Sequence, residues 1–430
     1  MGVSTRKNLL LLFIAIVILF FLTVFTIIGI VIFNAKTIVV PDDVDGINLA
    51  LAEAEEGDII LVKADGGPYF EEVSIDKDNI KLIGIGKEKP IINGTNMLGV
   101  GVEINNSNVL VQNFIIQNFA TAIRIFDSNH NMIKENDVRG NGFDGVLIDT
   151  SNRNIVKGNH IKDNGDDGIL LASSDINMIK KNNIEGNDQG ILINNESMNN
   201  VMGGNEVKGN TNEGISIEET STNNTLIGNQ VMDNGLDGIS LQNSLSNLFI
   251  KNTVNDNDVH GISLVNSVRN QFKGNTVNAN RVDGILLTSS NDNVLKGNTA
   301  NNNETGDGIF LSTSNGNTIK GNKVNGNGSS GIILSLNSDT NMVLDNFVLD
   351  NGNNGIFLNV SNENLIQGNK ANDNDLTGIL LTSDSNGNDV FFNRAFGNDN
   401  LDIRDLNVMP PLNTFIGNIC DFSSPPTICE

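Results

Sequence analysis

The sequence contains few of the residues that build several common kinds of functional site. It has no tryptophan and a single tyrosine, which disfavours a groove that stacks sugar rings or bases on aromatic side chains. Two cysteines and three histidines exclude a disulfide-dense scaffold and a Cys-rich or His-rich metal cluster. The formal net charge is −24, so we expect no nucleic-acid partner, because phosphate binding needs a basic face.

One long apolar run stands near the N-terminus. Residues 8–33 contain no charge over 26 positions, and a helix of that length spans about 39 Å, enough to cross a bilayer core of about 30 Å with some tilt. Arg6 and Lys7 precede the run, which places the N-terminus in the cytoplasm. We expect residues 1–36 to form a cytoplasmic tip and a single-pass anchor in the cell membrane, with the rest extracytoplasmic. The alternative is a cleaved signal peptide, although the run is long and lacks a good cleavage site.

The rest of the chain is one repeat. Three asparagines at intervals of five, such as Asn154, Asn159 and Asn164, precede a glycine that is followed by Ile or Val, any residue, and Leu or Ile. From Gly145 onward the glycines are 22–24 residues apart. The repeat glycines are Gly101, Gly145, Gly168, Gly190, Gly214, Gly238, Gly261, Gly284, Gly308, Gly331, Gly355 and Gly378.

The repeat predicts an all-β parallel solenoid. Apolar residues alternate between the asparagines, as at Val156, Ile161, Ile169 and Leu171, which is typical of short strands separated by turns. We expect about 14 coils of 22–24 residues with three short strands each. Between residues 101 and 400 there are 66 asparagines, and stacked columns of them can exchange amide-to-carbonyl hydrogen bonds. Asparagine and the repeat glycine would also supply left-handed turn backbone.

With this repeat, the chain resembles the right-handed single-stranded parallel β-helix proteins of the pectin-lyase-like superfamily, and most of all the NosD-type periplasmic repeat proteins. The resemblance covers residues 37 to about 420. It implies a first strand, a capping helix and the first coils at 37–98, β-helix repeats at 99–408 and a C-terminal cap at 409–430. Val44, Ile47 and Leu51 share one helical face, as such a capping helix requires. Capped ends favour a monomer.

The cap contains both cysteines of the chain. Cys420 and Cys429 are nine residues apart and lie in the extracytoplasmic part. We favour a disulfide between them on compartment grounds, and the alternative is two free thiols.

The residues before the repeat glycines define an edge column along the rod. Turn structure is the simplest explanation, because Asp, Asn, Ser and Thr before Gly are ordinary turn formers. The edge column consists of Asp144, Asp167, Gln189, Glu213, Asp237, His260, Asp283, Asp307, Ser330, Asn354 and Thr377.

Two functional hypotheses compete with turn structure. In the first, Asp237 and Asp283 form an acid/base pair with His260 between them, since two coils span about 9.6 Å and inverting glycosidases hold their carboxylates about 6.5–9.5 Å apart. In the second, acidic side chains bind a ligand or calcium, because stacked carboxylates repel one another and gain from a hard cation. The candidate ligand-binding residues are Asp144, Asp167, Glu213 and Asp307, and the candidate calcium ligands are Asp144, Asp166 and Asp167.

Family resemblance adds little to a catalytic interpretation. The segment VHGISL at 259–264 is similar to the Gly-His-Gly strand of polygalacturonases, but that family's paired aspartates and Arg-Ile-Lys element are absent. Resemblance to NosD would imply copper, yet His130, His160 and His260 fall in three different columns, so we do not expect copper. Calcium is the one cofactor that the sequence leaves open.

The regular spacing bears on function. Enzymes built on repeated coils form clefts from long inserted loops, and the spacing from Gly145 to Gly378 leaves no room for them. We expect a membrane-anchored, non-catalytic surface or envelope module that binds a glycan or a protein partner. The alternative is a polysaccharide-active enzyme: a lyase, a glycoside hydrolase or an epimerase.

Overall fold

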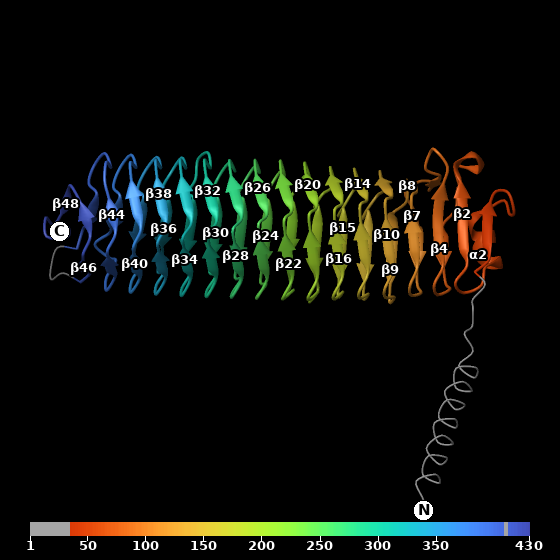
Figure 1. Cartoon of the computed structure of the whole chain (residues 1–430), viewed down its shortest axis with the longest axis horizontal. Coiled ribbons are helices and arrows are strands. Elements are labelled where there is room, and N and C mark those ends of the chain that lie inside the picture. Colours follow the sequence, from red (N-terminus) through yellow and green to blue (C-terminus); the bar gives the residue numbers. More distant parts are fainter. Residues whose placement is uncertain (1–34, 408–411) are drawn as a thin grey trace, which may run out of the picture.

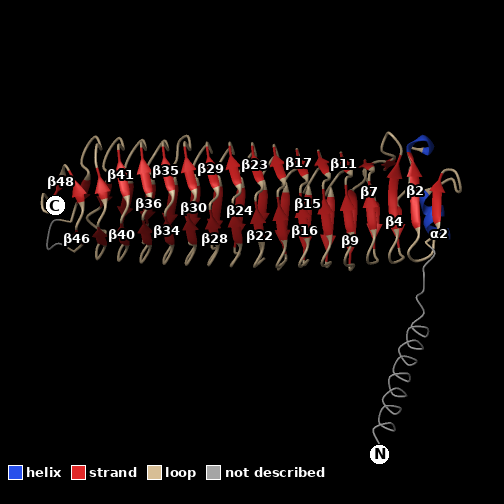
Figure 2. Cartoon of the chain, in the orientation of Figure 1, coloured by secondary structure: helices blue, strands red, loops and turns tan. Residues whose placement is uncertain are grey.

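The computed structural model describes residues 35–407 and 412–430, which form a straight rod of stacked coils (Figure 1). The anchor expected at residues 1–36 lies almost entirely outside the described residues. Within the described part of the chain, no helix combines the length and the apolar character that crossing a membrane requires. The described residues form short strands joined by turns, with one α-helix and one short 3-10 helix at the N-terminal end (Figure 2).

Three parallel sheets, A, B and C, run the length of the rod and contain 17, 15 and 16 strands. Sheet A consists of β1 (Thr37–Val40), β2 (Ile59–Lys63), β4 (Lys81–Ile85), β7 (Leu110–Gln112), β10 (Met132–Lys134), β13 (Ile155–Lys157), β16 (Met178–Lys180), β19 (Val201–Gly203), β22 (Thr225–Ile227), β25 (Leu248–Ile250), β28 (Gln271–Lys273), β31 (Val294–Lys296), β34 (Thr318–Lys320), β37 (Met342–Leu344), β40 (Leu365–Gln367), β43 (Asp389–Phe391) and β46 (Thr414–Ile416). Sheet B consists of β5 (Ile91–Asn93), β8 (Ile115–Gln117), β11 (Asp137–Arg139), β14 (His160–Lys162), β17 (Asn183–Glu185), β20 (Glu206–Lys208), β23 (Gln230–Met232), β26 (Thr253–Asn255), β29 (Thr276–Asn278), β32 (Thr299–Asn301), β35 (Lys323–Asn325), β38 (Phe347–Leu349), β41 (Lys370–Asn372), β44 (Arg394–Ala395) and β47 (Ile419–Cys420). Sheet C consists of β3 (Val73–Ile75), β6 (Val100–Ile104), β9 (Thr121–Phe126), β12 (Val146–Asp149), β15 (Ile169–Ala172), β18 (Ile191–Asn194), β21 (Ile215–Ile217), β24 (Ile239–Gln242), β27 (Ile262–Val265), β30 (Ile285–Thr288), β33 (Ile309–Ser312), β36 (Ile332–Ser335), β39 (Ile356–Asn359), β42 (Ile379–Leu381), β45 (Ile403–Asp405) and β48 (Ser423–Ser424).

The coil count corrects the expectation from the sequence. Sheet A contributes one strand to each of 17 coils, whereas the repeat predicted about 14. The count was too low because the first coils, built around β1, β2 and β4, pair in parallel without the glycine and asparagine signature. The segment 409–430, expected to be a cap, contains a further coil, since β46, β47 and β48 pair with β43, β44 and β45.

The C-terminal tail closes over this last coil. Cys429 forms a β-bridge with Asn418, and a disulfide joins it to Cys420 with a Cα–Cα distance of 5.7 Å. The cross-link therefore ties the end of the chain to sheet B.

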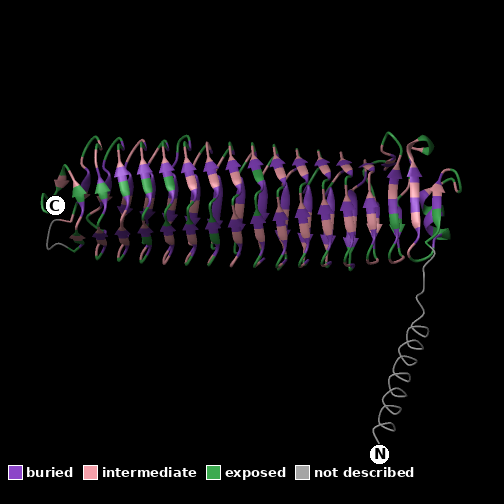
Figure 3. Cartoon of the chain, viewed as in Figure 1, coloured by how far each residue is buried: buried purple, intermediate pink, exposed green. Residues whose placement is uncertain are grey.

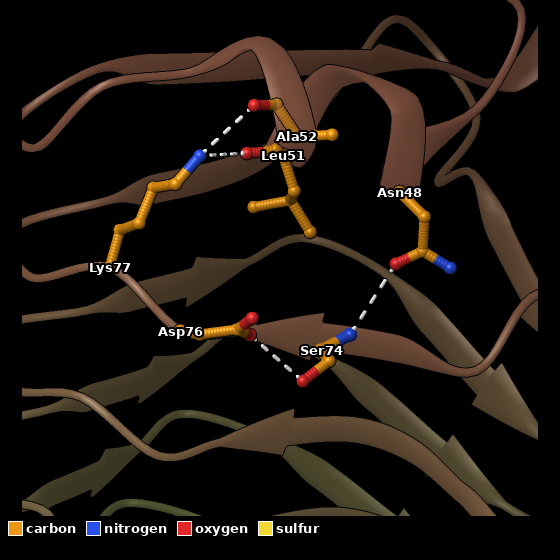
Figure 4. A pocket seen from close by; sticks show the side chains of 6 residues that line it. All are labelled: Asn48, Leu51, Ala52, Ser74, Asp76 and Lys77. Atoms are coloured by element: carbon orange, nitrogen blue, oxygen red, sulfur yellow. Dashed lines mark hydrogen bonds between the residues drawn. The ribbon is translucent and has the colours of Figure 1, made fainter.

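At the other end, the helix α2 (Ile47–Glu53) covers the rod. Its Ile47, Ala50 and Leu51 are buried, so the expected amphipathic capping helix is present, although it is shorter than the predicted face. Lys77 donates hydrogen bonds of 2.8 and 3.1 Å to the carbonyls of Leu51 and Ala52 (Figure 4). A lysine near the C-terminal carbonyls stabilises a helix. The hollow shown in Figure 4 lies where Lys77 makes these contacts with the end of α2, so we assign it a structural role.

The core is a narrow aliphatic column inside the three sheets. In sheets A and B the middle residue of nearly every strand points inward, as Val156 and Ile161 do, and in sheet C the first and third residues do, as Ile169 and Leu171 do. Figure 3 shows buried segments along the whole rod. The inward column predicted for sheet C, which includes Ile169 and Ile191, is likewise fully buried. The prediction of alternating inward residues is therefore confirmed.

Asparagine columns run along the turns as predicted, but their backbone differs from expectation. The backbone N–H of Asn154 donates a 2.8 Å hydrogen bond to Oδ1 of Asn177, the equivalent residue of the next coil. The left-handed residue stands one position earlier, as at Arg153 with φ 58° and Gly158 with φ 65°. The asparagines are thus required for their side chains, which satisfy buried backbone donors, and not for a left-handed conformation.

The repeat glycine is needed for space. Gly168 does not have a positive φ, which corrects the expected turn role. A Cβ on Gly168 would lie 2.6 Å from both the Gly190 carbonyl oxygen and Cγ2 of Ile184. Adjacent coils approach so closely at this corner that no side chain fits.

A serine column, which the sequence analysis missed, borders sheet C. The backbone N–H of Ser151 donates to Oγ of Ser174 at 3.0 Å, and this hydroxyl donates in turn to the Ile148 carbonyl at 3.0 Å. A serine three residues before the first asparagine of each triplet is the signal that could have revealed it.

Candidate functional site

The edge column lies where each coil passes from sheet B into sheet C. Asp237, for example, is followed by Gly238 and then by β24. Since β24 pairs residue for residue with β27, the column places Asp237 beside His260 on the neighbouring coil. Consecutive members are therefore separated by one coil, about 4.8 Å.

From Asp237 onward, the edge column is a hydrogen-bonded ladder. Oδ1 of Asp237 accepts from the backbone N–H of His260 at 2.9 Å, and Oδ1 of Asp283 accepts from the N–H of Asp307 at 2.7 Å. Ser330 and Asn354 accept from the next coil in the same way, at 3.3 and 3.2 Å. Carboxylate, hydroxyl and amide thus perform the same task, which is to satisfy a buried backbone donor.

The candidate acid/base group is partly buried within this ladder. Nδ1 of His260 lies 3.2 Å from both the backbone N and Oδ2 of Asp283, so the protonation state of the ring decides which of the two it bonds. Burial lowers the pKa of His260, but the hydrogen bond to Asp283 and the charge of Asp237 outweigh burial and raise it above its usual value. Burial raises the pKa of Asp237 despite the neighbouring histidine.

Asp237 and Asp283 are two coils apart on the edge column, with His260 between them. Oδ1 of each carboxylate accepts from the backbone of the coil that follows it, and the side chain of His260 is 16% exposed. The three predicted catalytic residues are therefore neighbours in space, and a catalytic role for them stays a prediction.

The acidic residues nearer the N-terminus have strongly raised pKa values. Burial, together with the charge of Asp144, raises the pKa of Asp167 to about 8, and burial raises that of Asp144 to about 6. Oδ1 of Asp144 is buried without a hydrogen-bond partner. Asp166, the third predicted calcium ligand, also has a raised pKa because of burial and the charge of Asp188.

The structure gives no ready-made metal centre. Within residues 35–407 and 412–430, no three His, Cys, Asp or Glu side chains gather in an arrangement that could hold a metal ion. His160 lies 2.9 Å from Glu185 on sheet B, away from His260 on the edge column. Calcium at Asp144, Asp166 and Asp167 stays a prediction.

The remaining predicted ligand-binding residues are separate. Glu213 accepts a 3.0 Å hydrogen bond from the side chain of Gln189, and burial raises its pKa. Asp307 accepts from the backbone N–H of Ser330 at 2.7 Å, and burial raises its pKa to about 6.

A serine notch interrupts the outward face of sheet C. On either side of it, the second residue of each strand is a large apolar one, such as Leu192 in β18 and Leu286 in β30. In β21, β24 and β27 this residue is Ser216, Ser240 or Ser263. The notch lies beside Glu213, Asp237 and His260 of the edge column. Gly-Ile-Ser in three consecutive repeats is the sequence signal, which the sequence analysis did not use.

A hollow of about 620 Å³ lies at the other end of sheet C, beside the turns that follow β15, β18, β21 and β24. It is lined by Ser173, Asn195, Glu196, Glu219, Thr220 and Asn243. Glu196 and Glu219 both adopt left-handed backbone, with φ 58° and 50°, and the serine column is broken next to them, because Oγ of Ser221 has no partner. The hollow and the serine notch therefore overlap at the coils of β21 and β24.

The comparisons with known proteins agree with this architecture. The family described as "Right handed beta helix region" matches residues 98–247, and the family described as "Periplasmic copper-binding protein (NosD)" matches residues 229–354 and 283–407. No curated protein matches the chain.

Among solved structures, the Dettilon tailspike protein is 16% identical with a TM-score of 0.50, covering 68% of this chain and 60% of that one. The periplasmic alginate epimerase AlgG is 16% identical with a TM-score of 0.43, covering 72% and 82%. The A-module of the Azotobacter vinelandii mannuronan C-5 epimerase AlgE4 is 13% identical with a TM-score of 0.42, covering 87% and 92%. Such identities bear on the fold alone. The three parallel sheets and the matches to both family models together show that the chain is a right-handed parallel β-helix repeat protein.

Proposed function

We propose that the chain is a non-catalytic, extracytoplasmic β-helix rod that is anchored in a membrane and binds a glycan or a protein partner along its faces. The uncharged run at residues 8–33 supports the anchor, and the match to a periplasmic family supports the location. The observation that carries the non-catalytic role is the ladder of the edge column. Ser330 and Asn354 occupy the same position as Asp237 and make equivalent hydrogen bonds.

The full chain in detergent, applied to a glycan array and to solubilised envelope proteins, tests this function. We expect saturable binding to one class of ligand, unchanged when Asp283 is replaced by Asn, because Asn can accept the same backbone hydrogen bond. Loss of all binding together with measurable turnover of a polysaccharide would contradict the proposal.

The second candidate is a polysaccharide-active enzyme. The serine notch supports it, because the cluster of Asp237, His260 and Asp283 lies beside the place where large outward side chains give way to serine. A raised pKa of Asp237 suits a general acid.

A product screen distinguishes the two candidates. Uronate polymers are incubated with the chain, and reducing ends and unsaturated products are measured. An enzyme would release products that Asp237→Asn and Asp283→Asn abolish, while Asp307→Asn, a ladder residue further from the notch, retains them. A binding module gives no products with any of the variants.

A further inference from the structure

Two stacks of lysines lie on the outward face of sheet A. In the first, Lys134, Lys157 and Lys180 are register partners on consecutive coils. In the second, which we call the central stack, Lys273, Lys296 and Lys320 are register partners in the same way. The coil spacing places the backbone of each lysine about 4.8 Å from that of the next. Like charges directly opposite one another on neighbouring strands are destabilising, so each stack gains from nearby negative charge.

The first stack has local partners. Nζ of Lys134 lies 3.2 Å from the Glu135 carboxylate, and Nζ of Lys180 lies 2.8 Å from the sulfur of Met178. All three lysines of this stack are half-buried. One lysine of this stack therefore has a carboxylate partner, and all three are partly covered by their neighbours.

The central stack is different. Lys273, Lys296 and Lys320 are exposed. Within the described residues, Asp345, 3.5 Å from Lys320, is the one carboxylate that forms an ion pair with this stack. Lys273 and Lys296 present their charge to solvent.

The strands around the central stack form a basic corner where sheet A meets sheet B. It consists of residues 248–255, 271–278, 294–301 and 318–325, four consecutive passes from sheet A to sheet B. These segments contain no Asp or Glu, although the chain has 51 of them. Their basic residues are Lys251, Lys273, Lys296, Lys320 and Lys323. The basic corner thus carries a positive charge on a rod whose net charge is −24.

The surface of the basic corner is open and polar. Gly297 and Gly321 follow Lys296 and Lys320, and a Cβ at either glycine would meet nothing within 4 Å. The outward side chains on the sheet B side include Thr276 and the amide of Asn301. None of the large hydrophobic side chains that are exposed on the described surface falls within these four segments.

We propose that the basic corner binds a linear anionic polysaccharide that lies along the rod axis, with its carboxylate or phosphate groups on the lysines and its hydroxyl groups on the threonines and asparagines. The inference rests on the proposed role as a binding module and names its ligand class and site. Nucleic acid is disfavoured because the corner offers no exposed aromatic side chain on which bases could stack. A membrane surface is disfavoured because the corner has no exposed apolar side chain to insert.

Polygalacturonate binding by the full chain in detergent tests the proposal, with neutral dextran as the blank. We expect saturable binding that weakens as salt rises, because ammonium–carboxylate contacts release counterions. Lys273→Glu with Lys296→Glu should weaken binding by about tenfold or more. Lys157→Glu with Lys180→Glu is the matched control, at the same sheet position in the first stack, and should change binding by less than about twofold. Circular dichroism confirms that both pairs remain folded.

Each other outcome overturns the inference. Equal loss with both pairs of substitutions would indicate a response to total charge, not a site. Tighter binding to duplex DNA or to phosphatidylserine vesicles would assign the corner to another partner. Phosphomannan in place of polygalacturonate separates a phosphate from a carboxylate preference, and binding to neither polymer removes the proposal. If the chain binds neither anionic polymer but binds neutral glycans or an envelope protein, the proposed function stands and only the basic corner's ligand is refuted. If the chain binds none of these, both the proposed function and this inference are refuted.

Discussion

The side-chain amide of Asn159 donates a 3.0 Å hydrogen bond to Oδ1 of Asn182, its counterpart one coil further along. The same amide donates to the carbonyl of Ile133 on the preceding coil at 3.0 Å. One asparagine therefore connects three coils, and both residues are at least 98% buried. A buried polar group destabilises a fold when it has no hydrogen-bond partner. Each asparagine column therefore stabilises the rod only if every coil supplies a side-chain amide to its neighbours.

Replacing one ladder amide should destabilise the rod. Asn182→Ala leaves buried donors and acceptors on both neighbouring coils without partners, and we expect a loss of about 1–3 kcal/mol. Thermal unfolding followed by circular dichroism measures it as a lower transition temperature. Gln242→Ala, which removes an exposed amide, is the control and should leave the transition unchanged. Equal transitions for the two variants would contradict the ladder's structural role.

The two kinds of glycine should respond in opposite ways to a side chain. Gly168→Ala places a Cβ 2.6 Å from the Gly190 carbonyl oxygen, and overpacking of this kind costs about 1–3 kcal/mol. Gly297→Asn should be tolerated, because that site has φ +64° and open space, and asparagine adopts left-handed backbone readily. The equivalent positions Lys181 and Lys251 already carry side chains there. Transition temperatures of the two variants test the contrast.

Stability should fall as pH rises from about 4 to about 8 because of Asp167. Its pKa is about 8 in the folded protein against 3.8 for the free side chain. Between those values the folded state holds a proton that the unfolded state has lost, so raising the pH favours unfolding. Asp167→Asn should remove this dependence, and its advantage in transition temperature over the wild type should grow from pH 5 to pH 8.

The exposed Asp163 provides the control for this pH series. Its carboxylate is 66% exposed, and Asp163→Asn should follow the wild-type profile. An advantage of Asp167→Asn over the wild type that stays constant from pH 5 to pH 8 would show that Asp167 is ionised in the folded state.

Two substitutions of Asp283 test whether its role in the fold is to accept a hydrogen bond or to carry a charge. Asp283→Asn retains an acceptor for the N–H of Asp307, the bond that spans 2.7 Å in the native protein, and should keep the native transition temperature. Asp283→Ala loses that acceptor and should lower stability by about 1 kcal/mol or more. If Asn lowers the transition as far as Ala does, the charge of Asp283 is itself needed by the fold.

The interior of the rod was largely predictable from the sequence, because inward side chains alternate and the asparagine triplet marks most of the coils. Coils without that signature, such as those of β1 and β2, could not be counted from it. The reasons for particular residues were harder to predict. A glycine at position 168 could be needed for a left-handed backbone or for lack of room for a side chain. The second reason depends on how closely Gly190 of the next coil approaches, and this distance is set only when the coils stack.

The surface features could be recognised only once the pairing register of the strands was known. The basic corner forms because Lys273 and Lys296 are 23 positions apart and become direct neighbours when β28 pairs with β31. The serine notch likewise appears when Ser216 and Ser240 are aligned. The edge column was identified from the sequence, but its hydrogen-bonded ladder was not, since the donors belong to the backbone of the following coil.

The stacking of 17 coils in uniform parallel register has a consequence for the reach of the molecule. Each repeat advances the rod by about 4.8 Å and contacts only the repeats on either side of it. Loss or duplication of a unit would therefore shorten or lengthen the protein by one fixed step and leave both ends intact. The number of coils therefore fixes the length of the rod, and the first and last coils are roughly 77 Å apart.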